Sequence, residues 1–88
     1  MSGAAEAETD VELKVDLHAR PAGALVKAAF GFHSKIRVVF QGREADARSL
    51  ISILGLGATS GKTIRLRAEG DDASDALEAL ATSLAAFQ

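Results

Sequence analysis

The only proline of this 88-residue chain, Pro21, separates two patterns of apolar residues. Over residues 11–16 apolar and charged side chains alternate, which is typical of a half-buried strand. Apolar residues then recur at helical spacing, at Ala22, Leu25, Val26, Ala29 and Phe30. Proline fits a helix only in its first turn, because it has no N–H to donate and its ring fixes φ. We therefore predict a strand over residues 11–16 and a helix over residues 19–30.

The rest of the chain alternates between the same two patterns. The further elements expected are strands over residues 35–40, 43–47 and 62–68, a short helix over residues 50–54 after Ser49, and a helix over residues 71–87. Each strand is apolar on one side only, so the helices should cover one face of a mainly antiparallel sheet. The predicted fold class is α+β, with element order βαββαβα in an open-faced two-layer sandwich.

Composition limits the classes of function. With 48% hydrophobic residues the chain suffices for one small domain, which we place at residues 11–88, with the acidic residues 1–10 as a disordered tail. Without cysteine or a cluster of metal ligands, neither a disulfide framework nor a metal site is expected. A net charge of −2 gives no support for nucleic-acid binding. Lacking a signal-peptide pattern and a long apolar run, the chain is expected to be cytoplasmic, with no membrane insertion.

His18 lies just before the predicted helix that contains Pro21. Backbone N–H groups in a first helical turn have no intrahelical acceptor, and the helix dipole is positive there. A phosphoryl group on the imidazole would be held by those N–H groups, and Arg20 is close enough in sequence to add charge-assisted hydrogen bonds. The alternative is that His18 is a weak N-cap and Arg20 a solvated charge. The spacing alone favours neither interpretation.

Three segments of the chain share their motifs with one protein family. They read LHARPAG (residues 17–23), ARSLISILGLGATSG (residues 47–61) and AEGDDASDALEAL (residues 68–80). Over about residues 11–87 the chain resembles the histidine-containing phosphocarrier (HPr) family of the bacterial phosphoenolpyruvate-dependent phosphotransferase system. The His-x-Arg-Pro signature, the serine before the short helix and the Leu-Gly loop have the family's separations. The resemblance implies strand order 1-4-2-3, with three helices on one face of the sheet.

The resemblance also implies a reaction. His18 Nδ1 would accept a phosphoryl group from phosphorylated enzyme I and pass it to a histidine of an EIIA-type domain during sugar uptake. Arg20 and the backbone N–H groups of Ala19 and Arg20 would hold the phosphate, with no metal or cofactor. The protein would be a stoichiometric phosphoryl carrier and not an enzyme. Two alternatives stay open: a regulatory HPr paralogue of the nitrogen-related branch, and an interaction module of the same fold that is not phosphorylated.

The resemblance places a partner-binding surface on the short helix. Leu50, Ile51 and Leu54 match the family's patch, and Leu50 and Ile51 should be the more exposed pair, unless all three are core residues. Lys27 would complement an acidic partner, or is an ordinary solvated lysine. Ser49 matches the serine that HPr kinase/phosphorylase modifies in many members, or is an ordinary N-cap. A sheet face that alternates to charge offers no large apolar patch, so a monomer is expected.

Asp16 departs from the family pattern, which usually has glycine two residues before the histidine. A carboxylate near His18 disfavours the phosphorylated ring through like-charge repulsion. We therefore predict that Asp16→Gly speeds transfer from enzyme I.

Overall fold

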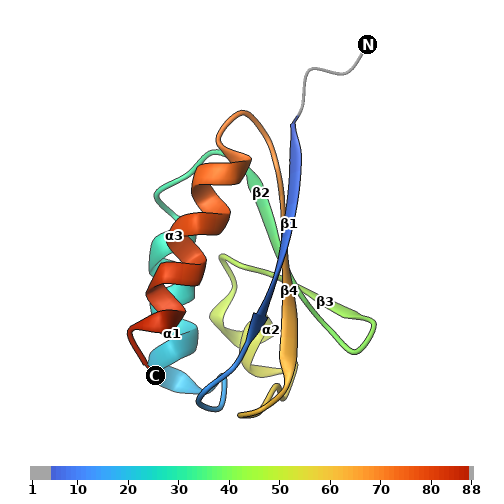
Figure 1. Cartoon of the computed structure of the whole chain (residues 1–88), viewed down its shortest axis with the longest axis vertical. Helices are drawn as coiled ribbons and strands as arrows, with labels where there is room; N and C mark the ends of the chain where they lie inside the picture. Colours follow the sequence, from blue (N-terminus) through green and yellow to red (C-terminus); the bar gives the residue numbers. More distant parts are fainter. Residues whose placement is uncertain (1–4, 88) are drawn as a thin grey trace.

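The computed structural model describes residues 5–87, which form four strands and three helices. Figure 1 shows two layers, a sheet and the helices on one of its faces. The elements are β1 (Glu6–Glu12), α1 (Ala19–Ala29), β2 (Lys35–Phe40), β3 (Arg43–Asp46), α2 (Leu50–Leu54), β4 (Thr63–Glu69) and α3 (Ala73–Ala85). All strand pairs in this sheet are antiparallel, in the order β1-β4-β2-β3. The α+β fold class and the strand order are therefore confirmed.

The core lies between the sheet and the helices. α1 and α3 lie side by side across the sheet, as Figure 1 shows. Alternate residues of β2 and β4 point into this layer, while their neighbours point to the open face. The largest fully buried apolar side chains come from both layers and are Leu25, Ile36, Val38, Ile53, Ile64, Leu66 and Leu80. Among the helices of residues 5–87, none has the length and apolar character needed to span a bilayer.

The first strand lies earlier in the chain than predicted. β1 runs from Glu6 to Glu12 and pairs with β4 over its whole length. Its inward residues, Ala7, Thr9 and Val11, are small or polar and only half-buried, so the segment lacks a strong apolar signal. Residues 6–10 belong to the sheet, so their assignment to a disordered tail is wrong, and the domain begins before residue 11. Residues 1–4 of the predicted tail lie outside the described residues.

Ion pairs with β4 support β1. Arg65 Nε donates to Asp10 Oδ1 at 2.9 Å, and Arg65 Nη1 lies 3.7 Å from Glu8 Oε1. Arg67 Nε lies 3.2 Å from the other carboxylate oxygen of Glu8. The hydrogen bond from Arg65 lowers the pKa of Asp10. Each of these pairs is about half exposed and contributes little by itself, but together they join an acidic strand to a basic one.

The helices lie where they were predicted, with α2 matching at both ends and α1 ending one residue early. α1 begins at the predicted residue, with Pro21 buried in its first turn. α3 is shorter at both ends than the predicted residues 71–87. Before it, the Asp72 carboxylate accepts hydrogen bonds from the N–H groups of His33 (2.8 Å) and Ser34 (3.0 Å) and from the Ser34 hydroxyl. The hydroxyl and then the His33 amide lower the pKa of Asp72, and the carboxylate thereby ties the start of α3 to β2.

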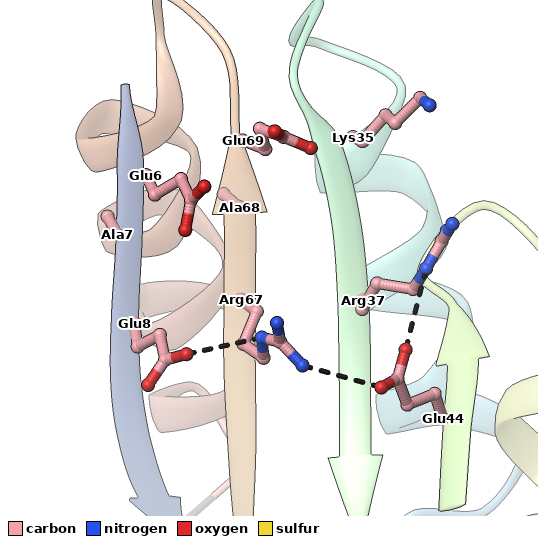
Figure 2. Close-up of a pocket in the computed structure, with 9 residues that line it drawn as sticks. All are labelled: Glu6, Ala7, Glu8, Lys35, Arg37, Glu44, Arg67, Ala68 and Glu69. Carbon is pink, nitrogen blue, oxygen red and sulfur yellow. Dashed lines mark hydrogen bonds and ion pairs between the residues drawn. The ribbon is translucent and has the colours of Figure 1, made fainter. Parts of the chain in front are cut away.

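The open face of the sheet carries the charged side chains drawn in Figure 2. Glu44 of β3 lies between two arginines, with one carboxylate oxygen 3.7 Å from Arg37 Nε and the other 3.3 Å from Arg67 Nη1. A hollow of about 170 Å³, open to solvent, lies among these residues and Glu8 of β1. Its arginines already pair with carboxylates, and it lies on the face opposite to the helices. It is therefore separate from the site that His18 forms.

Candidate functional site

His18 is the N-cap residue of α1. Its backbone is extended, with φ −105° and ψ −159°, and its carbonyl accepts a hydrogen bond from the N–H of Ala22 at 2.9 Å. Its own N–H donates to the carbonyl of Asp16 at 2.8 Å. The imidazole forms no capping hydrogen bond, and the residue is exposed. The helix start therefore leaves the ring accessible for a reaction.

The backbone donors next to His18 are the N–H groups of Ala19 and Arg20. Both precede the first intrahelical hydrogen bond, so neither has an acceptor within α1. Pro21 follows without an N–H; its ring fixes φ at this point, and its side chain is buried. The first turn contains no acidic residue, so the positive end of the helix dipole and the exposed guanidinium group of Arg20 act together. The predicted phosphate-holding N–H groups are thus adjacent to His18, which suits an anion attached to the ring.

Residues 13–17 lead to His18 alongside the loop that joins α2 to β4. The N–H of Gly61 donates to the carbonyl of Leu13 at 2.8 Å, and the N–H of Leu17 donates to the carbonyl of Ala58 at 2.9 Å. The predicted strand over residues 11–16 therefore ends at Glu12, because these residues bond to a loop in place of a neighbouring strand. The result is an irregular segment held in place just before the reactive residue.

The carboxylate of Asp16 takes part in this attachment. Asp16 Oδ1 accepts a hydrogen bond from the N–H of Ser60 at 2.9 Å, and the Ser60 hydroxyl donates to the carbonyl of Lys14 at 3.1 Å. Asp16 is exposed, so water also reaches its charge. Sequence reasoning missed Ser60 because 44 residues separate it from Asp16. Gly57 and Gly61, with φ of +68° and +87°, marked a loop there without indicating what it contacts.

The short helix α2 presents two exposed apolar side chains. Leu50 is 40% exposed and Ile51 is 83% exposed, so the expectation that these two are the more exposed pair is confirmed. Leu54 is half-buried and packs against the core. Ile53 is fully buried, although the predicted apolar set of this helix omitted it. Ile53, with the half-buried Leu54, anchors this five-residue helix, which leaves Leu50 and Ile51 free for other contacts.

Ser49 caps α2 as predicted. Its Oγ accepts a hydrogen bond from the N–H of Ser52 at 3.3 Å, and the two hydroxyl groups lie 2.9 Å apart. The structural role of Ser49 is thus established, while modification of the hydroxyl stays a prediction.

Lys27 and Phe30 lie near the end of α1 furthest from His18. Lys27 is exposed in the last turn. Phe30, which the predicted helix placed on its apolar face, is 66% exposed. At 100° per residue its side chain points roughly 80° away from Ala22 and roughly 100° away from Ala29, which are both fully buried. The prediction for Phe30 is therefore wrong, because the residue lies beside the apolar stripe of the helix and outside it.

The fold and the sequence match a known family. The model of the PTS-HPr family, described as "PTS HPr component phosphorylation site", matches residues 5–86. The chain belongs to the HPr family. It is 44% identical over 64 residues to phosphocarrier protein HPr of Buchnera aphidicola subsp. Acyrthosiphon pisum, covering 73% of this chain and 75% of that protein. It is also 40% identical over 75 residues to the HPr-like protein Crh of Halalkalibacterium halodurans, covering 85% of this chain and 89% of that protein.

Solved HPr structures share the architecture. Phosphocarrier protein HPr from Bacillus anthracis has a TM-score of 0.80 at 36% identity, over 94% of this chain and 99% of that one. An HPr dimer from Thermoanaerobacter tengcongensis has a TM-score of 0.75 at 38% identity, over 81% and 82% of the two chains. The match to the HPr family begins at residue 5, which agrees with β1 as the first element of the domain. The protein is thus an HPr-family phosphocarrier by fold and sequence.

Proposed function

We propose that this HPr-family protein accepts a phosphoryl group on His18 from phosphorylated enzyme I and passes it to a histidine of an EIIA-type domain during sugar uptake. The observation that carries the proposal is the exposed imidazole of His18 at the start of α1, beside the N–H groups of Ala19 and Arg20. The protein acts as a cytoplasmic monomer and as a stoichiometric carrier. It is a substrate of larger proteins more than an enzyme.

The proposed transfer is an exchange between two imidazoles. The Nδ1 lone pair of His18 attacks phosphorus and forms a new P–N bond, while the P–N bond to the donor histidine breaks and leaves its electron pair on that nitrogen. The N–H groups of Ala19 and Arg20, with the Arg20 guanidinium group, hold the phosphoryl oxygens. The exchange forms one P–N bond and breaks one, without any further covalent step, so positioning and electrostatics supply the catalysis. The exchange itself requires no metal or cofactor.

The proposed docking surface lies on α1 and α2 beside His18. Leu50 and Ile51 supply exposed apolar area, and Leu54 supports them from its half-buried position. Lys27, exposed on α1, adds a positive charge that complements an acidic partner. Exposure supports this role, since side chains committed to the core would not reach a partner.

Incubation with phosphoenolpyruvate and the enzyme I encoded in the same genome tests the carrier proposal. Intact-mass spectrometry should show one phosphoryl adduct that is labile in acid, as a phosphohistidine is. His18→Ala should abolish the adduct, while His33→Ala, a change at the other histidine, should leave it intact. An unmodified wild-type chain, or an adduct that persists in His18→Ala, would show that the proposal is wrong.

A regulatory role is the second candidate, and the similarity to an HPr-like protein named Crh favours it. Ser49 would then accept a phosphoryl group from an HPr kinase/phosphorylase, which places negative charge beside Leu50 and weakens enzyme I binding. Purified kinase with ATP should modify the wild-type chain and leave Ser49→Ala unmodified.

A paralogue of the nitrogen-related branch would pass its phosphoryl group to a different acceptor. The EIIA-type domain that takes the phosphoryl group from His18 therefore distinguishes that branch from sugar uptake.

A further inference from the structure

Three large apolar side chains stand out as exposed among residues 5–87. Leu50 and Ile51 lie on α2, and Phe30 follows the last residue of α1. The two helices contact each other, and Arg48, two residues before Leu50, contacts the Phe30 ring, so α2 and Phe30 belong to one part of the surface. The proposed docking surface uses Leu50 and Ile51 but leaves Phe30 unexplained. An aromatic ring that is 66% exposed costs free energy in water unless something covers it.

Arg48 contacts both the Phe30 ring and the turn that follows α1. The guanidinium group donates to the carbonyl of Phe32 and, at 3.3 Å, to the carbonyl of Ser34. Its Cζ atom also lies 5.8 Å from the centre of the Phe30 ring, within the range of a cation–π contact. Because both carbonyls belong to the turn after α1, one side chain braces the turn and the ring together. A ring restrained by such a contact loses less entropy than a free one when a partner covers it.

The helices α1 and α2 contain no carboxylate. Two carboxylates bond to the segments next to Phe30: Asp72 accepts from the N–H groups of His33 and Ser34, and Asp46 accepts from the N–H of Arg48. Asp and Glu are absent from residues 17–43 and 47–68, the stretches that contain α1, α2 and β2. The cations on these helices and just before α2 are Arg20, Lys27 and Arg48. The other acidic residues lie on β1 and β3, at the end of β4 (Glu69), just before and within α3, and at Asp16. Cations beside exposed apolar side chains, on helices without acidic residues, fit a partner whose apolar patch is bordered by carboxylates.

We propose that Phe30, braced by Arg48, is a second anchor for enzyme I, at the opposite end of α1 from His18. The 11 residues of α1 span about 16 Å. A standard protein interface of about 800 Å² per partner is about 32 Å across when it is round. One enzyme I molecule that covers α2 therefore reaches both His18 and Phe30. The inference rests on the proposed function and adds an aromatic contact, with an acidic group of enzyme I facing Arg48.

Steady-state phosphorylation by enzyme I tests this anchor. Phe30→Ala should raise the KM of enzyme I for the chain by about tenfold with kcat nearly unchanged, as loss of an anchor residue does. Arg48→Lys keeps the charge but loses the forked contact with two carbonyls, so it should give a smaller rise in KM. Val39→Ala, a truncation on the open face of the sheet, is the matched control and should leave KM within twofold.

Two further measurements separate folding and function from docking. Thermal melts followed by circular dichroism should show that Phe30→Ala folds, since its ring contributes little to the core. Phosphoramidate, a small donor with no docking surface, should phosphorylate Phe30→Ala and the wild type at the same rate. If enzyme I phosphorylates wild type and Phe30→Ala with the same KM, the anchor is refuted and the carrier function stands. If enzyme I does not phosphorylate the wild type, the proposed function itself fails.

Discussion

Asp16 is the residue where charge and position act in opposite directions on His18. Its carboxylate repels a phosphoryl group, yet the same carboxylate accepts the hydrogen bond from Ser60 that holds the segment before His18. Asp16→Gly removes both effects, whereas Asp16→Asn removes only the charge, because an amide oxygen can still accept from the Ser60 N–H. The two variants therefore separate repulsion from positioning.

We expect both variants to be phosphorylated faster by enzyme I than the wild type, with Asp16→Asn the faster of the two. Two unit charges in water repel by about 1 kcal/mol at about 4 Å and by less at larger separations, so the gain in rate should be about fivefold at most. Rapid-quench phosphorylation measures the rates, and protection of the Ser60 amide against hydrogen exchange reports whether the segment is held. An Asp16→Gly rate equal to or below that of the wild type would show that repulsion does not limit the transfer.

Gly70 is a second residue whose identity is dictated by its immediate surroundings. Its φ of +148° suits glycine alone, and a Cβ atom there would lie 2.6 Å from Ser34 Oγ and 2.9 Å from Ser34 Cα. Gly70→Ala should therefore lower the free energy of unfolding by about 2 kcal/mol or more, as measured by urea denaturation. Gly23→Ala is the matched control, because nothing lies within 4 Å of its Cβ position inside α1. It should be neutral or stabilising by up to about 1 kcal/mol, and equal losses in the two variants would contradict this explanation.

At the scale of elements, the stability of the sheet depends on contacts between charged side chains of neighbouring strands, which the sequence of one strand does not show. Arg37 of β2 and Arg67 of β4 are register partners, and like charges placed opposite each other destabilise a sheet. Glu44 of β3 contacts both arginines and compensates this repulsion. The position of Glu44 on the edge strand is therefore part of what allows two arginines to face each other.

Glu44→Gln should lower the free energy of unfolding by about 0.5–1 kcal/mol in dilute buffer, and by less at high salt, because the side chains are about half exposed. Glu12→Gln removes a carboxylate that pairs with Lys14, two residues away, and should change stability by less than about 0.3 kcal/mol. Urea denaturation at two salt concentrations measures the difference. An equal effect of the two substitutions would show that Glu44 does not offset the repulsion between the arginines.

Most elements were predictable from the sequence, and the exceptions have physical causes. α1 was placed correctly because Pro21 fits only a first turn, and β2 and β4 because their apolar alternation is strong. β1 was placed too late because its inward residues are weakly apolar and its support comes from arginines about 55 residues away. His18 and Arg20 were recognisable as a local motif. The contact of Asp16 with Ser60 and that of Arg48 with Phe30 were not, because each depends on how separate elements pack.

At the scale of the whole molecule, the exposed edge of β1 bears on the oligomeric state. The outward residues of this edge strand are all acidic, so an antiparallel pair of β1 strands would place Glu8 of one copy against Asp10 of the other. We therefore expect a monomer at neutral pH, although an HPr dimer is among the solved relatives. Sedimentation velocity over a concentration series tests this. Glu8→Gln with Asp10→Asn should increase self-association, and a stable wild-type dimer would contradict the expectation.

In the proposed function, the phosphoryl group on His18 lies at the open N-terminus of α1. Nuclear magnetic resonance of the ¹⁵N-labelled chain, before and after phosphorylation by enzyme I and phosphoenolpyruvate, observes this directly. We expect phosphorus bonded to His18 Nδ1, with downfield shifts of the Ala19 and Arg20 amide protons as they bond to the phosphoryl oxygens. Phosphorylation at another residue, or a phosphorylated His18 that leaves both amide protons unmoved, would contradict the central claim.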